Sequence, residues 1–305
     1  MIDQKKFLIT TADERTWKSD QPKVFLGEWC RLFERKHIWQ SMNAKVAEPY
    51  GLNLNQKDID FHEVIRLEQK LFPEIYLLLN QFHGMKHDER YWSILIGHWF
   101  RAFLQLMINR LKTLEKCFQT EKISHTTVLD SEYASLSTPD IASSLLSFHN
   151  DQWNNVLYGR IINLINEDKI FINFLKGKNF YTYQSNKFNY KADTNSFKKR
   201  IINFINLSYY KIASKFVKNE DSFIINTYLS KINEFRLELA LGQFPQRWQS
   251  LTPEISSKPD QELRKKLTKK FENKSIDKLE TILRSLLFEL IPVCYLEGLS
   301  NLYDV

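Results

Sequence analysis

The stretch KVFLGEWCRLFERKHIW, residues 23–39, places a short apolar run directly before a glycine and a glutamate. The apolar run predicts a buried strand that ends at Gly27, and the residues after it predict a helix that reaches Gln40. A carboxylate at the carboxyl end of a buried strand is placed to act as a general base, so Glu28 is the candidate catalytic residue. The competing interpretation is an aromatic core helix, with Trp29 in an apolar stripe and a solvated opposite face.

Two further apolar runs flank this segment and predict strands. KFLIT, residues 6–10, precedes the polar sequence TADE, and AKVAEPYG, residues 44–51, is a weaker run that ends in proline and glycine. Strand–loop–helix alternation of this kind builds parallel sheets, whose ligands collect at the carboxyl ends of the strands. We therefore expect the side chains of Thr10, Thr11 and Glu14 to share one sheet edge with Glu28.

Helical periodicity dominates the remainder of the chain. The helical segments are 58–83, 91–118, 137–167, 196–217, 225–245 and 277–299, and residues 179–191 alternate weakly like a strand. Eight glycines and eight prolines in 305 residues are too few for the many tight turns of a sandwich or barrel. The sequence therefore predicts an α/β, helix-rich fold with a short parallel sheet and many long helices.

Three cysteines lie far apart and form no CxxC or CxxH spacing, which excludes a disulfide framework and a zinc knuckle. We expect a cytoplasmic protein, because the N-terminus lacks a secretory apolar run. Segment 91–109 has about the length of a membrane span, yet His98 and Arg101 lie near its middle. It predicts a buried helix, with an interfacial helix as the alternative.

The net charge of +7 is unevenly distributed. Residues 1–150 hold 19 Lys+Arg and 19 Asp+Glu, whereas residues 151–305 hold 24 and 17. Basic runs at 198–200 and 264–274 predict solvated helix faces, or a surface for an anionic partner such as a phosphate or a lipid headgroup. No nucleic-acid-binding motif accompanies them, so we expect no nucleic-acid partner.

The segment NQFHGMKHDERYW, residues 80–92, separates two apolar helices with polar and aromatic side chains. Loops of this composition often hold binding groups. Four side chains are candidates for binding an anionic or polyhydroxyl ligand, three from this loop and one from the first segment: His83, Arg90, Tyr91 and His37. The alternative for the loop is helix capping with local ion pairs. His83 and His87 have the spacing of two metal ligands on a helix, but Gly84 weakens that helix, so we predict no metal site.

Several blocks together resemble a family of bacterial transferases linked to surface-carbohydrate biosynthesis and known mainly by a locus-tag name. The blocks, in family order, are LITTADERTW, FLGEWC with RKHIW, LNQFHG with RYWSILIGHW, DQWNNVLYGRII, LALGQFPQRW and IPVCYLEGL. The resemblance implies a GT-B-like glycosyltransferase about twice this length, with a Rossmann-like N-terminal domain. Residues 1–305 would form its N-terminal, acceptor-side domain, with a possible subdivision into an α/β part, 1–150, and a basic helical part, 151–305. The C-terminal nucleotide-sugar domain would lie outside this chain.

The resemblance also implies a reaction. A sugar would pass from a nucleotide-activated donor to a surface polysaccharide or glycolipid acceptor, at the inner face of the membrane, with help from a C-terminal donor-binding half. Enzymes of this type generally use positive side chains and helix dipoles in place of a bound metal, so we expect no cofactor. Glu28 would activate the acceptor, and the other candidates would position acceptor or phosphate groups. The alternative is a non-catalytic membrane-surface or binding scaffold with a basic helical face.

Overall fold

The computed structural model describes residues 5–165, 170–176, 209, 213, 215–218, 220–222, 224, 229–245, 258–272 and 277–300. The chain divides into two compact units, one formed by Met1–Ser185 with Ile255–Val305 and the other by Asn186–Glu254. Each unit is described by itself. The weakly predicted strand at 179–191 and most of the predicted helix at 196–217 lie outside the described residues.

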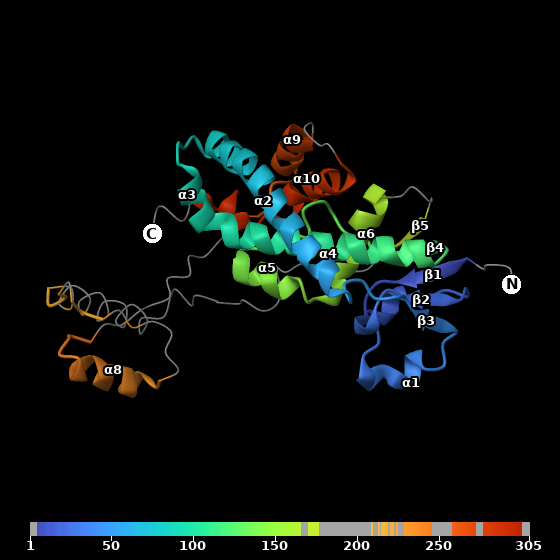
Figure 1. Cartoon of the computed structure of the whole chain (residues 1–305), viewed down its shortest axis with the longest axis horizontal. Helices are drawn as coiled ribbons and strands as arrows, with labels where there is room; N and C mark the ends of the chain where they lie inside the picture. Colours follow the sequence, from blue (N-terminus) through green and yellow to red (C-terminus); the bar gives the residue numbers. More distant parts are fainter. Residues whose placement is uncertain are drawn as a thin grey trace. The chain divides into compact units, whose positions relative to one another are not determined.

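The first unit is built on a sheet of five parallel strands, which confirms the predicted α/β, Rossmann-like class (Figure 1). The strands run in the order β3-β2-β1-β4-β5, with β1 at the centre. Their bounds are β1 Lys6–Ile9, β2 Lys23–Phe25, β3 Ala44–Val46, β4 Ile123–Leu129 and β5 Phe171–Leu175. The three predicted strands are confirmed. The pairing of Ile9 with Phe25 brings the carboxyl ends of β1 and β2 side by side.

A layer of helices packs against this sheet and shares one core with it. Their bounds are α2 Leu54–His83, α3 Glu89–Trp92, α4 His98–Thr120, α5 Ile141–Ser147, α6 Asp151–Ile165, α9 Gln261–Glu272 and α10 Lys278–Leu290. Two shorter turns complete the layer, the π-turn η4 Ser93–Gly97 and the 3-10 turn η5 Val293–Tyr295. Helix α2 continues through Pro73 and ends where Gly84 takes a left-handed conformation, φ 65°.

The membrane-like segment forms α3, η4 and the start of α4, as the buried-helix prediction requires. Trp99, Phe100 and Phe103 pack into the core, while His98 and Arg101 face solvent. Apolar residues three and four apart on one helix form such a stripe. None of the helices in the described parts of the chain combines the length and apolar character that crossing a bilayer requires.

The predicted helix from Glu28 to Gln40 is wrong. The structure has 3-10 turns at Glu28–Cys30 (η2) and Phe33–Arg35 (η3), then the single-turn helix α1, Lys36–Trp39. Leu32 between them is extended, and its carbonyl accepts a hydrogen bond of 2.8 Å from Trp39 Nε1. The indole N–H of Trp39 thus occupies a carbonyl that a continuous helix would pair with the N–H of Lys36.

The apolar stripe predicted for this segment is not buried either. Phe33 is 78% exposed and Trp29 is nearly half exposed, so the core interpretation of Trp29 is also wrong. The indole of Trp29 folds over Gly27, where a Cβ would overlap the ring. Trp39 is partly buried and stacks beneath the guanidinium of Arg31, whose Cζ lies 4.9 Å from the ring centroid. The segment is therefore a surface lobe fixed by aromatic contacts.

The described part of the second unit centres on one helix, α8, Lys231–Ala240. Ser230 caps it by accepting a hydrogen bond from the backbone N–H of Asn233. The side chain of Gln243 then bonds both the N–H and the carbonyl of Ser222, at 2.8 and 2.9 Å, which ties the end of the helical segment to a preceding turn.

Candidate functional site

Asn155 on α6 is the centre of a hydrogen-bonded bracket at the carboxyl edge of the sheet. Its side chain is fully buried. Its Oδ1 accepts from the N–H of Leu129 at 2.7 Å, and its Nδ2 donates to Thr127 O and Thr10 Oγ1, each at 3.1 Å. One amide therefore joins the ends of β1 and β4 to the first turns of α6, and it holds Thr10, the first residue after β1.

Three successive carbonyls at the end of β1 accept side-chain donors. Cys30 Sγ donates to Ile9 O at 3.6 Å, Trp29 Nε1 to Thr10 O at 3.1 Å, and Trp17 Nε1 to Thr11 O at 2.9 Å. Burial raises the pKa of the Cys30 thiol to about 12, so it stays protonated. These bonds satisfy backbone acceptors where the ladder ends and hold the loop after β1 against η2.

Asp151, the first residue of α6, faces this loop. Its Oδ1 accepts a hydrogen bond of 3.2 Å from the N–H of Ala12. Burial raises the pKa of the Asp151 carboxyl, and the nearby charge of Asp13 raises it further, against the lowering effect of the Ala12 bond. A carboxylate whose pKa is displaced toward neutrality is a better proton acceptor than an ordinary aspartate.

An open depression of about 400 Å³ lies at the same place. Its walls come from the loop after β1 and from the start of α6: Asp13, Arg15, His149, Asn150, Asp151 and Gln152. The carboxylate of Asp13 caps the turn at Glu14–Thr16 and pairs with the guanidinium of Arg15, which fixes that wall. Acidic, basic and imidazole groups therefore meet around one concave surface at the sheet edge where ligands of parallel sheets bind.

The predicted residues Thr10 and Thr11 lie at this edge, inside the fold. The Thr10 hydroxyl accepts from Asn155, so its role is to hold the bracket. The Thr11 hydroxyl is buried and has no hydrogen-bond partner among the residues that the structure describes. An unsatisfied buried hydroxyl costs about 1–3 kcal/mol, and such groups concentrate at functional positions.

Glu14, Glu28 and His37 lie on the outer rim of the same edge. Arg35 donates to both Glu14 oxygens, at 2.6 and 2.7 Å, and these bonds lower the pKa of Glu14, with a smaller contribution from His37. The carboxylate of Glu28 is exposed, pairs with Arg31, and does not line the depression. Glu14 and Glu28 thus follow β1 and β2 as the sequence predicts, and the structure adds arginine partners for both carboxylates.

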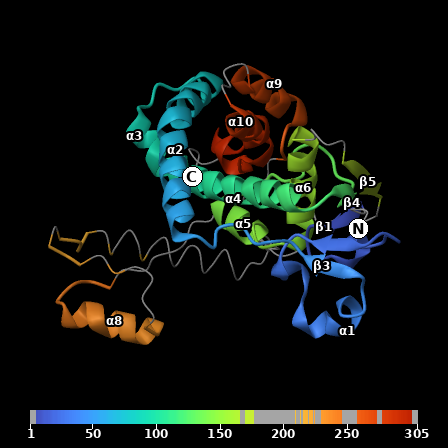
Figure 2. The same ribbon diagram turned by 45° about the vertical axis from the view of Figure 1, so that its right-hand side comes forward.

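His83, Arg90 and Tyr91 lie elsewhere. Figures 1 and 2 show α3 at one end of the helical layer and β1 to β3 at the other. His83 Nε2 lies 3.2 Å from Tyr295 O, and burial lowers the pKa of this imidazole. Tyr91 stacks on His87 with 3.8 Å between ring centroids, and Arg90 is exposed. These three residues are not brought to the sheet edge with Thr10 and Glu28.

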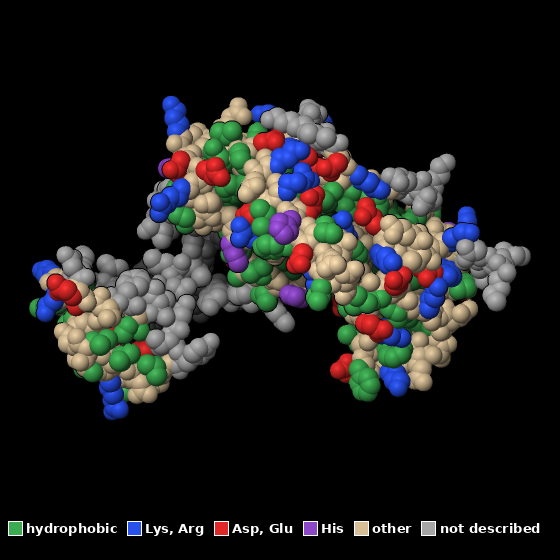
Figure 3. Space-filling model, viewed as in Figure 1, with side chains coloured by type: hydrophobic (Ala, Val, Ile, Leu, Met, Phe, Trp, Pro, Cys, Tyr) green, Lys and Arg blue, Asp and Glu red, His purple; other side chains and the backbone are tan. Residues whose placement is uncertain are grey.

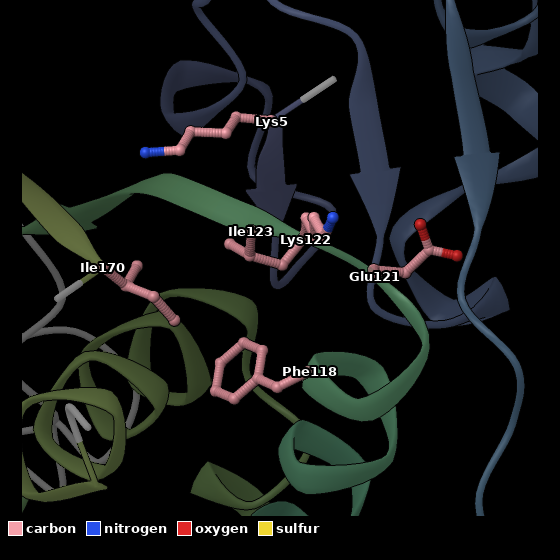
Figure 4. Close-up of a pocket in the computed structure, with 6 residues that line it drawn as sticks. All are labelled: Lys5, Phe118, Glu121, Lys122, Ile123 and Ile170. Atoms are coloured by element: carbon pink, nitrogen blue, oxygen red, sulfur yellow. The ribbon is translucent and has the colours of Figure 1, made fainter. Parts of the chain in front are cut away.

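A second depression, of about 230 Å³, opens at the amino ends of the strands (Figure 4). The side chains of Phe118, Ile123 and Ile170 face one another there, while the carboxylate of Glu121 turns away. Although burial favours the neutral acid, hydrogen bonds from Lys45 and Lys6 lower the pKa of Glu121. The charge of Glu121 is therefore compensated by two lysines.

The comparisons with known proteins give one match. A family model described as "LIC12162 family transferase" matches residues 6–305. No curated protein matches the chain. No solved structure matches it either. Within the described ranges, no three His, Cys, Asp or Glu side chains are grouped to hold a metal ion.

Proposed function

The chain belongs to the LIC12162 family of transferases, and from this membership we propose that it transfers a sugar from a nucleotide-activated donor to a surface polysaccharide or glycolipid acceptor. The observation that carries the proposal is the depression at the carboxyl edge of the sheet, with the carboxylate of Asp151 in its wall. Hydroxyl acceptors need a base, and this carboxylate combines partial burial with a raised pKa.

The fold supports a GT-B-like arrangement. A parallel Rossmann-like sheet with loops at its carboxyl edge is the architecture expected of the acceptor-side half of such an enzyme. In that arrangement the acceptor lies over the loop after β1 and the first turn of α6. The nucleotide-sugar is held by a second, donor-binding domain, so turnover needs both.

The proposed chemistry is a single displacement. Oδ1 of Asp151 accepts from Ala12, which fixes the carboxylate, and Oδ2 takes the proton of the acceptor hydroxyl. The acceptor oxygen then forms a bond to the anomeric carbon, while the bond from that carbon to the phosphate oxygen breaks. The nucleotide leaves with the electron pair. Positioned proton acceptors of this kind contribute about 10²- to 10⁴-fold to rates.

Glu28, the base predicted from the sequence, remains the second candidate. Its carboxylate stands after β2, next to the loop that carries Asp151's hydrogen bond, but it is exposed and paired with Arg31. An exposed paired carboxylate is better placed to orient acceptor hydroxyls than to take a proton in a water-excluded site. Replacing Glu28 with Gln should therefore raise KM more than it lowers kcat. A larger loss of kcat from Glu28→Gln than from Asp151→Asn would exchange the two roles.

The experiment is a donor and acceptor screen. The purified protein, with any nucleotide-binding chain that co-purifies or is encoded beside it, is incubated with UDP-, GDP-, dTDP- and CMP-sugars and an envelope glycolipid extract. Acceptor-dependent release of nucleotide from at least one donor is expected. Absence of release from every donor, by a folded protein that carries both domains, contradicts the proposal and favours a non-catalytic scaffold.

A further inference from the structure

Helix α8 presents its apolar side chains to solvent. Ile232, Phe235 and Leu239 are 67%, 50% and 53% exposed. Their spacing of three and four residues places them on one side of the helix, and we call this set the apolar face. Glu238, by contrast, is only 4% exposed. An ordinary surface helix turns its apolar stripe inward, whereas α8 exposes these three apolar side chains together with the charged side chain of Arg236.

Other exposed apolar side chains in the same unit extend this character. Phe216 and Leu241 are each more than half exposed. Phe216 stacks on Phe244, with 5.4 Å between ring centroids, so it is held in place rather than free. Figure 3 shows hydrophobic side chains gathered over the visible side of α8. Exposed apolar side chains that gather on one unit in this way mark an interaction site.

The charge of the unit indicates what the apolar face meets. Residues 186–254 contain 11 Lys+Arg and 6 Asp+Glu, a net charge of +5 out of +7 for the whole chain. Lys215, Lys218 and Arg236 are exposed. Two copies of a unit with this charge repel each other, which disfavours self-association. An anionic lipid surface attracts the basic charge and accepts apolar side chains at the boundary between headgroups and acyl chains.

We propose that the apolar face of α8 docks this protein on anionic lipid bilayers. Ile232, Phe235 and Leu239 enter the interface, and the surrounding lysines and arginines contact lipid phosphates. Neither the apolar face nor the basic charge is sufficient alone, because stable membrane anchoring normally combines apolar insertion with basic charge. The docking itself is independent of catalysis. Its consequence, that the acceptor is a membrane-bound glycolipid, rests on the proposed function.

The test is co-sedimentation of the full-length chain with vesicles of phosphatidylcholine alone or mixed with phosphatidylglycerol, without any nucleotide-sugar. Binding to the anionic vesicles only is expected, with several-fold loss as salt rises from about 0.1 to about 0.5 M. The variant Ile232→Ser/Phe235→Ser/Leu239→Ser should lose about tenfold or more of that binding. Because no sugar transfer is involved, an inactive preparation still gives an answer.

A matched control alters three apolar residues of the other unit that are 60–76% exposed, Leu52→Ser/Leu54→Ser/Ile59→Ser, and should bind like the wild type. A second variant, Lys215→Glu/Lys218→Glu, changes charge alone and should also weaken binding, even if the serine variant misfolds. Three results would overturn the proposal. These are equal binding to neutral vesicles, undiminished binding by both α8-unit variants, or a stable dimer in solution that the serine variant dissociates.

Discussion

Replacing Asn155 with Ala should destabilise the sheet-bearing unit by about 3 kcal/mol. The substitution removes three hydrogen bonds, from Leu129 N at 2.7 Å and to Thr127 O and Thr10 Oγ1 at 3.1 Å. Leu129 and Thr10 are buried, so their polar atoms cannot recover water as a partner. Each buried polar group that is left without a partner costs about 1–3 kcal/mol. The alanine variant no longer buries the polar amide of Asn155, which offsets part of this loss.

The assay is thermal unfolding, followed by urea unfolding for a free energy. About 3 kcal/mol corresponds to a decrease in Tm of about 6–12 °C for a unit of this size. Asn55→Ala is the matched control, because the Asn55 side chain is exposed on the first turn of α2, and its change should stay within about 0.5 kcal/mol. A decrease in the free energy of unfolding below about 1 kcal/mol for Asn155→Ala would show that the hydrogen bonds of Asn155 do not hold this edge of the sheet together.

Three further outcomes follow from the packing and charges. Gly159→Ala should cost about 1–3 kcal/mol in urea unfolding, because its Cβ would lie 2.5 Å from Val128 Cγ1 on the adjacent strand. Arg284→Met should cost about 2–4 kcal/mol by the same assay, since Phe271 O loses its buried donor and the fully buried carboxylate of Glu280 loses its guanidinium partner, although it keeps Lys70 at 2.5 Å. The raised pKa of Asp151 means that the folded chain holds this proton to higher pH than the unfolded chain, so the Asp151 contribution to stability falls as pH rises. The Tm of Asp151→Asn minus that of the wild type should therefore increase from about pH 4 to about pH 7, and a constant difference would contradict the pKa shift.

The strands β1, β2 and β3 were predictable because each is an apolar run that polar or glycine residues end. Strand β4 was missed although it is next to the central strand. Its sequence ISHTTVL has four consecutive polar residues, so it shows neither an apolar run nor a polar–apolar alternation, and the fully buried Thr126 donates its hydroxyl to Leu8 O at 3.0 Å. A polar residue satisfied by a neighbouring strand's backbone cannot be distinguished from an exposed one by periodicity alone.

The placement of the candidate residues was predictable in part. Strand ends identified Thr10, Thr11 and the rim around Glu28, because the carboxyl ends of parallel strands meet at one edge. Asp151 and Asn155 were missed, since their importance depends on where α6 lies over β4. One signal was available: two adjacent asparagines inside the apolar stretch DQWNNVLYG are costly to bury unless they bond to something.

The predicted helix after Gly27 failed for a related reason. Periodicity describes what a helix could bury, but here indole N–H groups capture backbone carbonyls of Thr10 and Leu32. Those bonds compete with the helical pattern and leave Phe33 exposed. Tertiary hydrogen bonds between residues 7 to 19 positions apart are not visible in a local pattern.

The most direct measurement compares nucleotide release by Asp151→Asn with release by the wild type, once a donor is identified. Asparagine keeps the oxygen that accepts from Ala12, so the loop after β1 should hold and Tm near neutral pH should not fall. A decrease in kcat of about 10²-fold or more is predicted, while Asp130→Asn, an exposed residue just after β4, should retain full activity. Wild-type kcat in a folded Asp151→Asn protein would contradict the assignment of this carboxylate, and with it the site at the carboxyl edge of the sheet.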